Sequence, residues 1–130
     1  MRAFLLAAAV VATTLVPAVA QAGGVWTVHV RNETDHCAWI TVYHRHGFSP
    51  TSWEIATAGW APAEQTSTFR INSWVELKVR AEIKSGGRCA NVANVGDTYD
   101  VTMGARDRDA TYNTHIVRRE NGRFQLWFLR

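Results

Sequence analysis

Apolar and polar residues alternate along most of the chain after residue 24. A period of two is typical of β-strands that bury one face and expose the other. The clearest alternation covers residues 74–84, where charged residues occupy every position between five apolar ones, namely Val75, Leu77, Val79, Ala81 and Ile83. A helix would distribute these five side chains around its circumference, so the pattern predicts a strand.

Weaker alternation and turn residues predict further strands. These cover residues 25–32, 37–45, 53–57, 66–71, 89–95, 99–103, 112–119 and 123–129. The Asn121-Gly122 pair between the last two strands is the strongest short-range hairpin signal. Residues 33–36 are expected to join the first two strands as another hairpin. In that pairing, Trp26 and Trp39 share one face, which we expect to be buried.

Eight or nine short strands with no convincing helix after the N-terminal segment indicate an all-β fold. The spacing favours a small antiparallel β-sandwich, with a small closed β-barrel as the alternative. In strand number and length the chain resembles immunoglobulin-like sandwiches. It lacks their Cys…Trp…Cys pattern, because Trp39 follows Cys37 almost immediately. The resemblance therefore implies an architecture and no function.

The first 22 residues have the parts of a signal peptide. Arg2 precedes an apolar stretch at residues 3–16, and small residues at positions 18, 20 and 22 fit cleavage after Ala20 or Ala22. The stretch is shorter than the roughly 20 apolar residues of a membrane span. We therefore expect residues 1–22 to be removed, residues 23–130 to form one all-β domain, and the protein to be secreted or periplasmic.

Charge and cysteine content fit an exported domain. Without Arg2 the chain has 13 basic and 11 acidic residues, a net charge of +2, and no long block of one sign. This weak charge argues against a nucleic-acid partner. Cys37 and Cys89 are the two cysteines, and an even count in an exported chain predicts one disulfide.

Aromatic residues near turns are the candidate binding residues. The chain has six tryptophans, and two of them, Trp53 and Trp60, flank turns in the Gly- and Pro-containing segment 47–64 together with Phe48. Loops on a rigid β-scaffold often carry binding residues, and an indole joins a large apolar face to one N–H donor. We expect Phe48, Trp53 and Trp60 to bind a protein or glycan partner. The alternative is a membrane-active or toxin-like domain whose exposed aromatic residues engage a membrane surface.

No catalytic or phosphate-binding motif is present, so a non-enzymatic role is favoured and no cofactor is expected. A small hydrolase built from dispersed carboxylates such as Glu54, Glu64 and Asp97 remains a minor alternative. His44 and His46 lie on one strand face, yet a transition-metal site needs three or four convergent ligands. No metal site is predicted.

Overall fold

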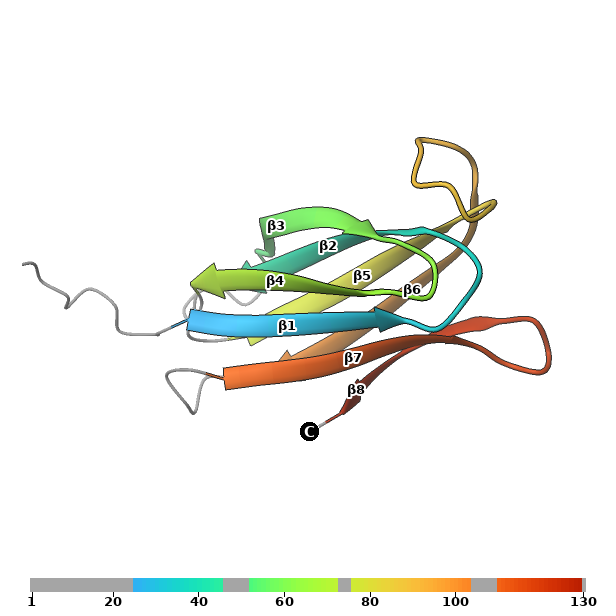
Figure 1. Cartoon of the computed structure of the whole chain (residues 1–130). Helices are drawn as coiled ribbons and strands as arrows, with labels where there is room; N and C mark the ends of the chain where they lie inside the picture. Colours follow the sequence, from blue (N-terminus) through green and yellow to red (C-terminus); the bar gives the residue numbers. More distant parts are fainter. Residues whose placement is uncertain (1–24, 46–51, 73–75, 104–109, 130) are drawn as a thin grey trace, which may run out of the picture.

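The computed structural model describes residues 25–45, 52–72, 76–103 and 110–129, and these residues form two four-stranded sheets (Figure 1). One sheet has the strand order β4-β1-β7-β8 and the other has the order β3-β2-β5-β6. The strands are β1 (Val25–Asn32), β2 (Ala38–Arg45), β3 (Glu54–Ala61), β4 (Thr66–Asn72), β5 (Glu76–Lys84), β6 (Asn94–Met103), β7 (Ala110–Arg118) and β8 (Phe124–Leu129).

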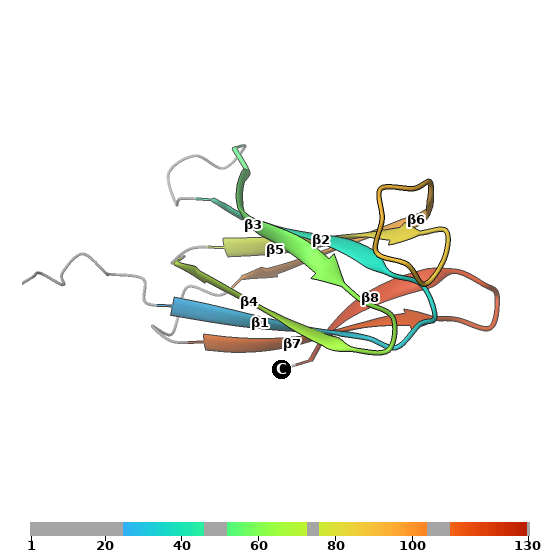
Figure 2. The ribbon, with the colours of Figure 1, turned by 45° about the horizontal axis from the view of Figure 1, so that its top comes forward.

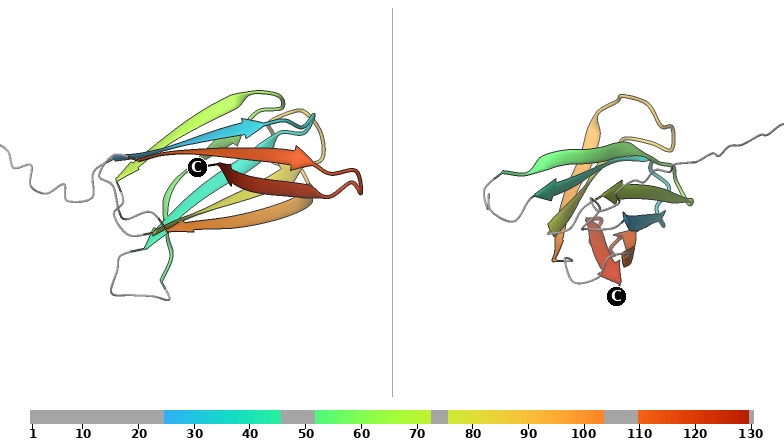
Figure 3. Two further views of the ribbon diagram at one scale, coloured as in Figure 1. Left: turned by 90° about the horizontal axis from the view of Figure 1, so that it is seen from below. Right: turned by 90° about the vertical axis from the view of Figure 1, so that its left-hand side faces the viewer.

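The two sheets pack face to face as a sandwich, which confirms the predicted fold class; they do not close into a barrel (Figure 3, right). Alternate residues of both sheets fill the space between them. β1 contributes Trp26, Val28 and Val30, and β5 contributes four fully buried side chains, namely Leu77, Val79, Ala81 and Ile83. The alternation that predicted β5 is therefore a burial pattern of the folded chain.

β1 and β2 do not form the expected hairpin, because they belong to different sheets. β1 pairs with β4 in antiparallel and with β7 in parallel orientation. Between β1 and β2 the chain crosses from one sheet to the other around the buried Asn32 side chain. Its Nδ2 donates to the carbonyls of His36 (2.7 Å) and Ala61 (2.9 Å). Its Oδ1 accepts from the backbone N–H (3.0 Å) and hydroxyl (2.7 Å) of Thr34.

β3 continues to Ala61, whereas the sequence predicted a strand that ends at residue 57. Gly59 lies opposite Ile40 on the inner side of the sheet, where it faces Phe69 of the other sheet. A Cβ at Gly59 would lie 3.0 Å from the Phe69 ring. Glycine here therefore provides room for an aromatic ring, and the strand continues through it.

The C-terminal hairpin forms where the Asn-Gly pair predicted it. β7 pairs with β8 in antiparallel orientation, and Gly122 has a φ of 83° in the connecting turn. The Arg119 N–H donates to the Arg123 carbonyl (2.8 Å) and the Gly122 N–H donates to the Arg119 carbonyl (2.8 Å). Glycine adopts this left-handed conformation without steric cost.

Cys37 and Cys89 form the predicted disulfide, with their Cα atoms 5.2 Å apart. It ties the residue before β2 to the loop 85–93, which joins β5 to β6 and projects from one end of the sandwich (Figures 1 and 2). The strand predicted at 89–95 is wrong, since β6 starts at Asn94 and the preceding residues form turns. Among the described residues, no helix has the length and apolarity to span a membrane.

Candidate functional site

Trp39 lies on the outer face of the β3-β2-β5-β6 sheet, so the expectation that it shares a buried face with Trp26 is wrong. In β2 the fully buried side chains are those of Ala38, Ile40 and Val42, and Trp39 is half-buried on the opposite side. The expectation failed because β2 carries hydrophobic residues on both of its faces. Its alternation shows that it is a strand without showing which face turns inward.

Trp39 and Trp60 form an aromatic pair on this outer face. They are direct partners across the β2–β3 ladder. Their ring centroids are 4.8 Å apart and their planes meet at 74°, an edge-to-face arrangement that aromatic rings prefer over a stacked sandwich. Each indole leaves part of its surface in solvent. The pair therefore presents two aromatic surfaces at a steep angle to each other.

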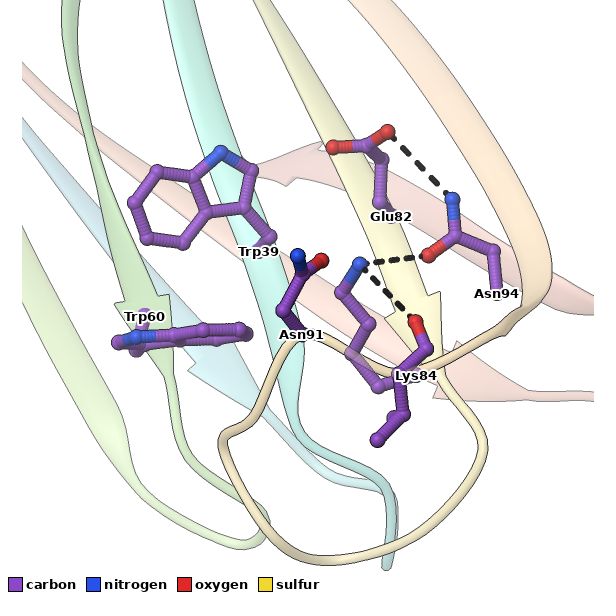
Figure 4. Close-up of a pocket in the computed structure, with 7 residues that line it drawn as sticks. Trp39, Trp60, Glu82, Lys84, Asn91 and Asn94 are labelled. Carbon is purple, nitrogen blue, oxygen red and sulfur yellow. Dashed lines mark hydrogen bonds between the residues drawn. The ribbon is translucent and has the colours of Figure 1, made fainter.

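A hollow of about 510 Å³ lies beside these indoles (Figure 4). Its walls combine the two rings with polar side chains of β5, β6 and the 85–93 loop, and the lining residues are Trp39, Trp60, Glu82, Lys84, Asn91, Val92 and Asn94. Ligand sites commonly combine apolar or aromatic walls with a few convergent polar groups. This hollow has that composition.

Hydrogen bonds join three of the polar residues into one wall (Figure 4). The Lys84 ammonium donates to Asn94 Oδ1 (2.7 Å) and to the Val92 carbonyl (3.5 Å), and Asn94 Nδ2 donates to Glu82 Oε1 (3.4 Å). Lys84 is only 7% exposed, so its stem is packed while its head is held by Asn94. This chain of contacts fixes the orientation of the amide and of the carboxylate that face the hollow.

The disulfide holds the remaining side of the hollow in place. Asn91 and Val92 belong to the 85–93 loop, which Cys89 links to Cys37 at the start of β2. Backbone bonds support the same junction, since the Cys37 N–H donates to the Gly86 carbonyl (2.9 Å) and the Ser85 N–H to the Ala93 carbonyl (3.0 Å). The loop is thereby anchored at both its base and its middle.

Comparison with known proteins adds a distant structural likeness to this description. No protein-family model matches the sequence, and no curated protein sequence matches it. Among solved structures, the NMR structure of the protein from Eubacterium rectale is similar, with a TM-score of 0.49 and 13% identity over 82% of this chain and 89% of that chain. A likeness this distant carries no argument about a ligand or an activity.

The three residues predicted to bind a ligand are placed differently. Trp60 lines the hollow. Trp53 precedes β3 at the opposite end of that strand, where its ring contacts the Arg45 guanidinium (4.8 Å) and the Lys78 ammonium (4.7 Å). Phe48 lies outside the described residues. Trp53 and Trp60 thus lie near opposite ends of β3, in separate surroundings.

Trp53 belongs to a group of rings around Lys78. The Lys78 Nζ lies 4.8 Å from the Tyr43 ring centroid, 4.7 Å from that of Trp53 and 5.6 Å from that of Tyr99, distances at which cation–π attraction operates. Arg80 also lies over Tyr99, at 5.0 Å. These rings surround cations of the chain itself, and none of them lines the hollow beside Trp39 and Trp60.

Arg80 is held in its charged form. Its partial burial works against the charge, but a hydrogen bond with Tyr43 and the nearby Tyr99, Glu82 and Asp97 outweigh that effect, so the pKa of Arg80 is raised. Its guanidinium lies 3.7 Å from Glu82 and 3.6 Å from Asp97. Arg80 therefore balances the charge of the carboxylate that lines the hollow.

The carboxylates considered for hydrolysis are dispersed. Glu54 starts β3 near His44, and Glu64 lies beyond the other end of that strand. Asp97 lies on β6, paired with Glu82 of β5. In the part of the chain that the structure describes, no three His, Cys, Asp or Glu side chains are grouped closely enough to hold a metal ion.

Sequence reasoning missed Trp39 and the polar wall of Glu82, Lys84 and Asn94. A partial signal existed, because the alternation of residues 74–84 places Glu82 on the solvated face. Nothing in the sequence indicated that Trp39 would lie in the same sheet, opposite Glu82. That neighbourhood depends on pairing between β2 and β5, which are 30 or more residues apart along the chain.

Proposed function

We propose that this protein is an exported, non-enzymatic β-sandwich that binds a saccharide in the hollow beside Trp39 and Trp60. The observation that carries the proposal is the combination of two partly exposed indoles with a wall of carboxylate and amide groups in one recess. Neither part alone would be sufficient, because single exposed aromatics and single polar residues are common on protein surfaces.

The chemistry of the walls matches that of a sugar ring. A pyranose has faces of C–H groups, which pack on an aromatic ring, and a rim of hydroxyls, each both donor and acceptor. An indole supplies a rigid apolar surface and one N–H donor. Glu82 supplies acceptors, and the amides of Asn91 and Asn94 supply both donors and acceptors. The hollow therefore offers a partner for each part of the ring.

An uncharged saccharide fits the electrostatics of the hollow best. Its lining contains one carboxylate, Glu82, and one ammonium, Lys84, so their formal charges cancel. Asn94 contacts both groups, and Arg80 also contacts Glu82. A charged ligand would meet a group of its own sign within the same recess, whereas hydroxyls bond to either.

A binding role is favoured over hydrolysis by the position of the acidic groups. Glycosidases generally use a pair of carboxyl groups on either side of the scissile bond. Glu82 is the one carboxylate in the lining of the hollow, and its neighbour Asp97 contacts Arg80. Glu54 and Glu64 lie at opposite ends of β3.

Export is supported by two independent features. The first 22 residues carry the charge, apolar length and small-residue pattern of a signal peptide. The Cys37–Cys89 disulfide fits an oxidising compartment, because thiols in the cytosol are mostly kept reduced. Both features favour a secreted or periplasmic location.

Titration calorimetry against a panel of neutral oligosaccharides tests the proposal. The panel contains β-linked glucose, xylose, mannose and N-acetylglucosamine oligomers. We expect at least one to bind, and we expect Trp39→Ala and Asn94→Ala to weaken that binding by about tenfold or more, as loss of a stacked ring or a paired polar group does.

Ile55→Ala is the control, because Ile55 is an exposed apolar residue on β3 of the same sheet and does not line the hollow. It should leave the affinity unchanged. Absence of binding across the panel, or equal losses from Trp39→Ala and Ile55→Ala, would contradict the proposal.

A further inference from the structure

The outer face of the β4-β1-β7-β8 sheet carries a row of cations. Alternate residues point away from the buried core, and they include Arg31 and His29 on β1, Arg70 on β4 and His115 on β7. Arg119 follows β7, and it is placed on the same side by its contacts with Gln125 and with the ring of Trp127 (5.1 Å).

The three arginines contact no carboxylate within the described ranges. Arg31 donates to the backbone carbonyl of Glu64 (2.9 Å), Arg119 donates to the Gln125 amide oxygen, and Arg70 is exposed with no ion pair to another described residue. The acidic contact on this face is that of Glu33 with His115 (3.3 Å). Guanidinium groups whose partners are neutral keep their capacity to pair with an external anion.

The register of the strands sets the spacing of these arginines. Arg70 pairs with Thr27, which lies four residues before Arg31 on β1, so the two arginines are about 14 Å apart along the strand direction. His115 pairs with Arg31 across the parallel β1–β7 ladder, and Arg119 lies four residues further on. The Cα atoms of the three arginines therefore span roughly 27 Å along the sheet, and the Arg119 guanidinium reaches back from its end of the row to the Trp127 ring.

We propose that this row binds a linear acidic polysaccharide, with carboxylates paired to Arg70, Arg31 and Arg119 and a sugar ring packed on Trp127. Arginine forks bind carboxylates in a bidentate geometry. Trp127 is 42% exposed and pairs with His115 at the middle of the row, which places an aromatic surface among the cations. This site is on the other sheet and does not rest on the function proposed for the hollow.

The small number of cations and the polarity of the face favour this partner over two others. Duplex DNA carries one charge per about 1.7 Å of its axis, and its binding depends on neutralising many phosphates, whereas this face has three arginines and the carboxylate of Glu33 beside His115. A membrane-binding face would need an apolar area to insert among the lipids. Here the described outward-facing residues around Trp127 are mostly polar, with His115, Asn113 and Gln125 on the neighbouring positions and Val117 as a single small apolar group.

Binding of the oxidised protein to polygalacturonate, measured by affinity electrophoresis and calorimetry, tests the proposal. We expect binding that weakens as salt rises from about 20 to about 150 mM, since screening shortens the reach of the charges. Arg31→Gln/Arg70→Gln should weaken it by about tenfold or more, as loss of charged hydrogen bonds does. Trp127→Ala should weaken it by a few-fold.

The matched control is Lys78→Gln/Arg88→Gln, which removes the same charge from the other sheet and from an exposed loop position. It should retain the affinity of the unmodified protein. Equal loss in the two double variants would overturn the proposal by showing that only net charge matters. No binding at low salt would also overturn it.

Anionic vesicles and duplex DNA serve as the competing ligands. Binding to either one that equals or exceeds binding to polygalacturonate, with the same sensitivity to Arg31→Gln/Arg70→Gln, would overturn the choice of partner. Trp39→Ala should leave polygalacturonate binding intact, so failure at this face is distinguishable from failure of the hollow.

Discussion

The two outer faces of the sandwich are both built from alternating strands, but they differ in shape and in the pairing of their charges. On the β3-β2-β5-β6 sheet, Arg45 contacts Glu76 and Arg80 contacts Glu82 and Asp97, and a hollow opens beside two indoles. On the β4-β1-β7-β8 sheet the described arginines have neutral partners or none. The comparison shows that a tethered loop, rather than the sheet itself, turns one face into a recess.

Removal of the disulfide should produce the largest effect and should act on one face. In Cys37→Ala/Cys89→Ala the free energy of unfolding should fall by about 4 kcal/mol, because the bridge closes a loop of 52 residues in the unfolded chain. Denaturation by guanidinium chloride, carried out on the oxidised protein and on the variant, measures the difference in the free energy of unfolding.

The same variant should lose saccharide binding at the hollow and retain polygalacturonate binding at the other face. The reason is that the bridge anchors the loop that carries Asn91 and Val92, whereas the arginines of the row belong to the other sheet and its hairpin. Equal loss at both faces, in protein still folded by circular dichroism, would contradict the division between them.

Asn32→Ala should lower the free energy of unfolding by about 3 kcal/mol, because it removes a buried amide that makes four hydrogen bonds and leaves its buried partners unpaired. Asn32 lies where the chain passes between the sheets, so native-state hydrogen exchange should accelerate in both of them. Asn113→Ala, an exposed asparagine on β7, is the control and should change stability by less than about 0.5 kcal/mol.

Gly59→Val should lower the free energy of unfolding by about 2 kcal/mol through overpacking, since a Cβ at this position would lie 3.0 Å from the Phe69 ring. Ala58→Val, on the exposed side of the same strand, should be close to neutral. Combining Gly59→Val with Phe69→Leu should recover part of the loss, and thermal unfolding of the four proteins gives the coupling. Additive losses would show that the two residues do not compete for space.

The smallest effect concerns the charges themselves. A double-mutant cycle on Arg45 and Glu76 should give a coupling of up to about 1 kcal/mol that decreases with salt, since both side chains are partly exposed. Arg70→Gln should leave stability within about 0.5 kcal/mol, because Arg70 has no ion pair among the described residues. If Arg70→Gln lowered stability by as much as the Arg45–Glu76 coupling energy, the two outer faces would not differ in the pairing of their charges.

Local signals in the sequence predicted the strands and one hairpin well. The charged and apolar alternation around Leu77 and Val79 corresponds to burial in β5, and Asn121-Gly122 forms the turn between β7 and β8. In these segments the pattern and the fold agree because the determining contacts lie within a few residues. The two cysteines likewise left one pairing available.

Long-range pairing could not be predicted in the same way. β1 and β2 are neighbours in sequence with compatible alternation, yet the bonding capacity of Asn32 directs the chain into the second sheet. The hollow was missed for the same reason, because Trp39 and Asn94 come together only through pairing of β2, β5 and β6. The position of Trp60 beside a turn was visible, whereas its neighbours were not.

The parallel contact between β1 and β7 has a consequence for the order of assembly. The first strand of the domain has its two partners at residues 66–72 and 110–118, so it has no neighbour close in sequence with which to pair. Pairings of such wide separation form slowly, since the intervening polypeptide must first be brought into place. During synthesis, β1 therefore emerges long before β7 and stays without this partner until the chain is nearly complete. Until then the edges of β1 are exposed, and they are the part of the chain that a chaperone would need to shield.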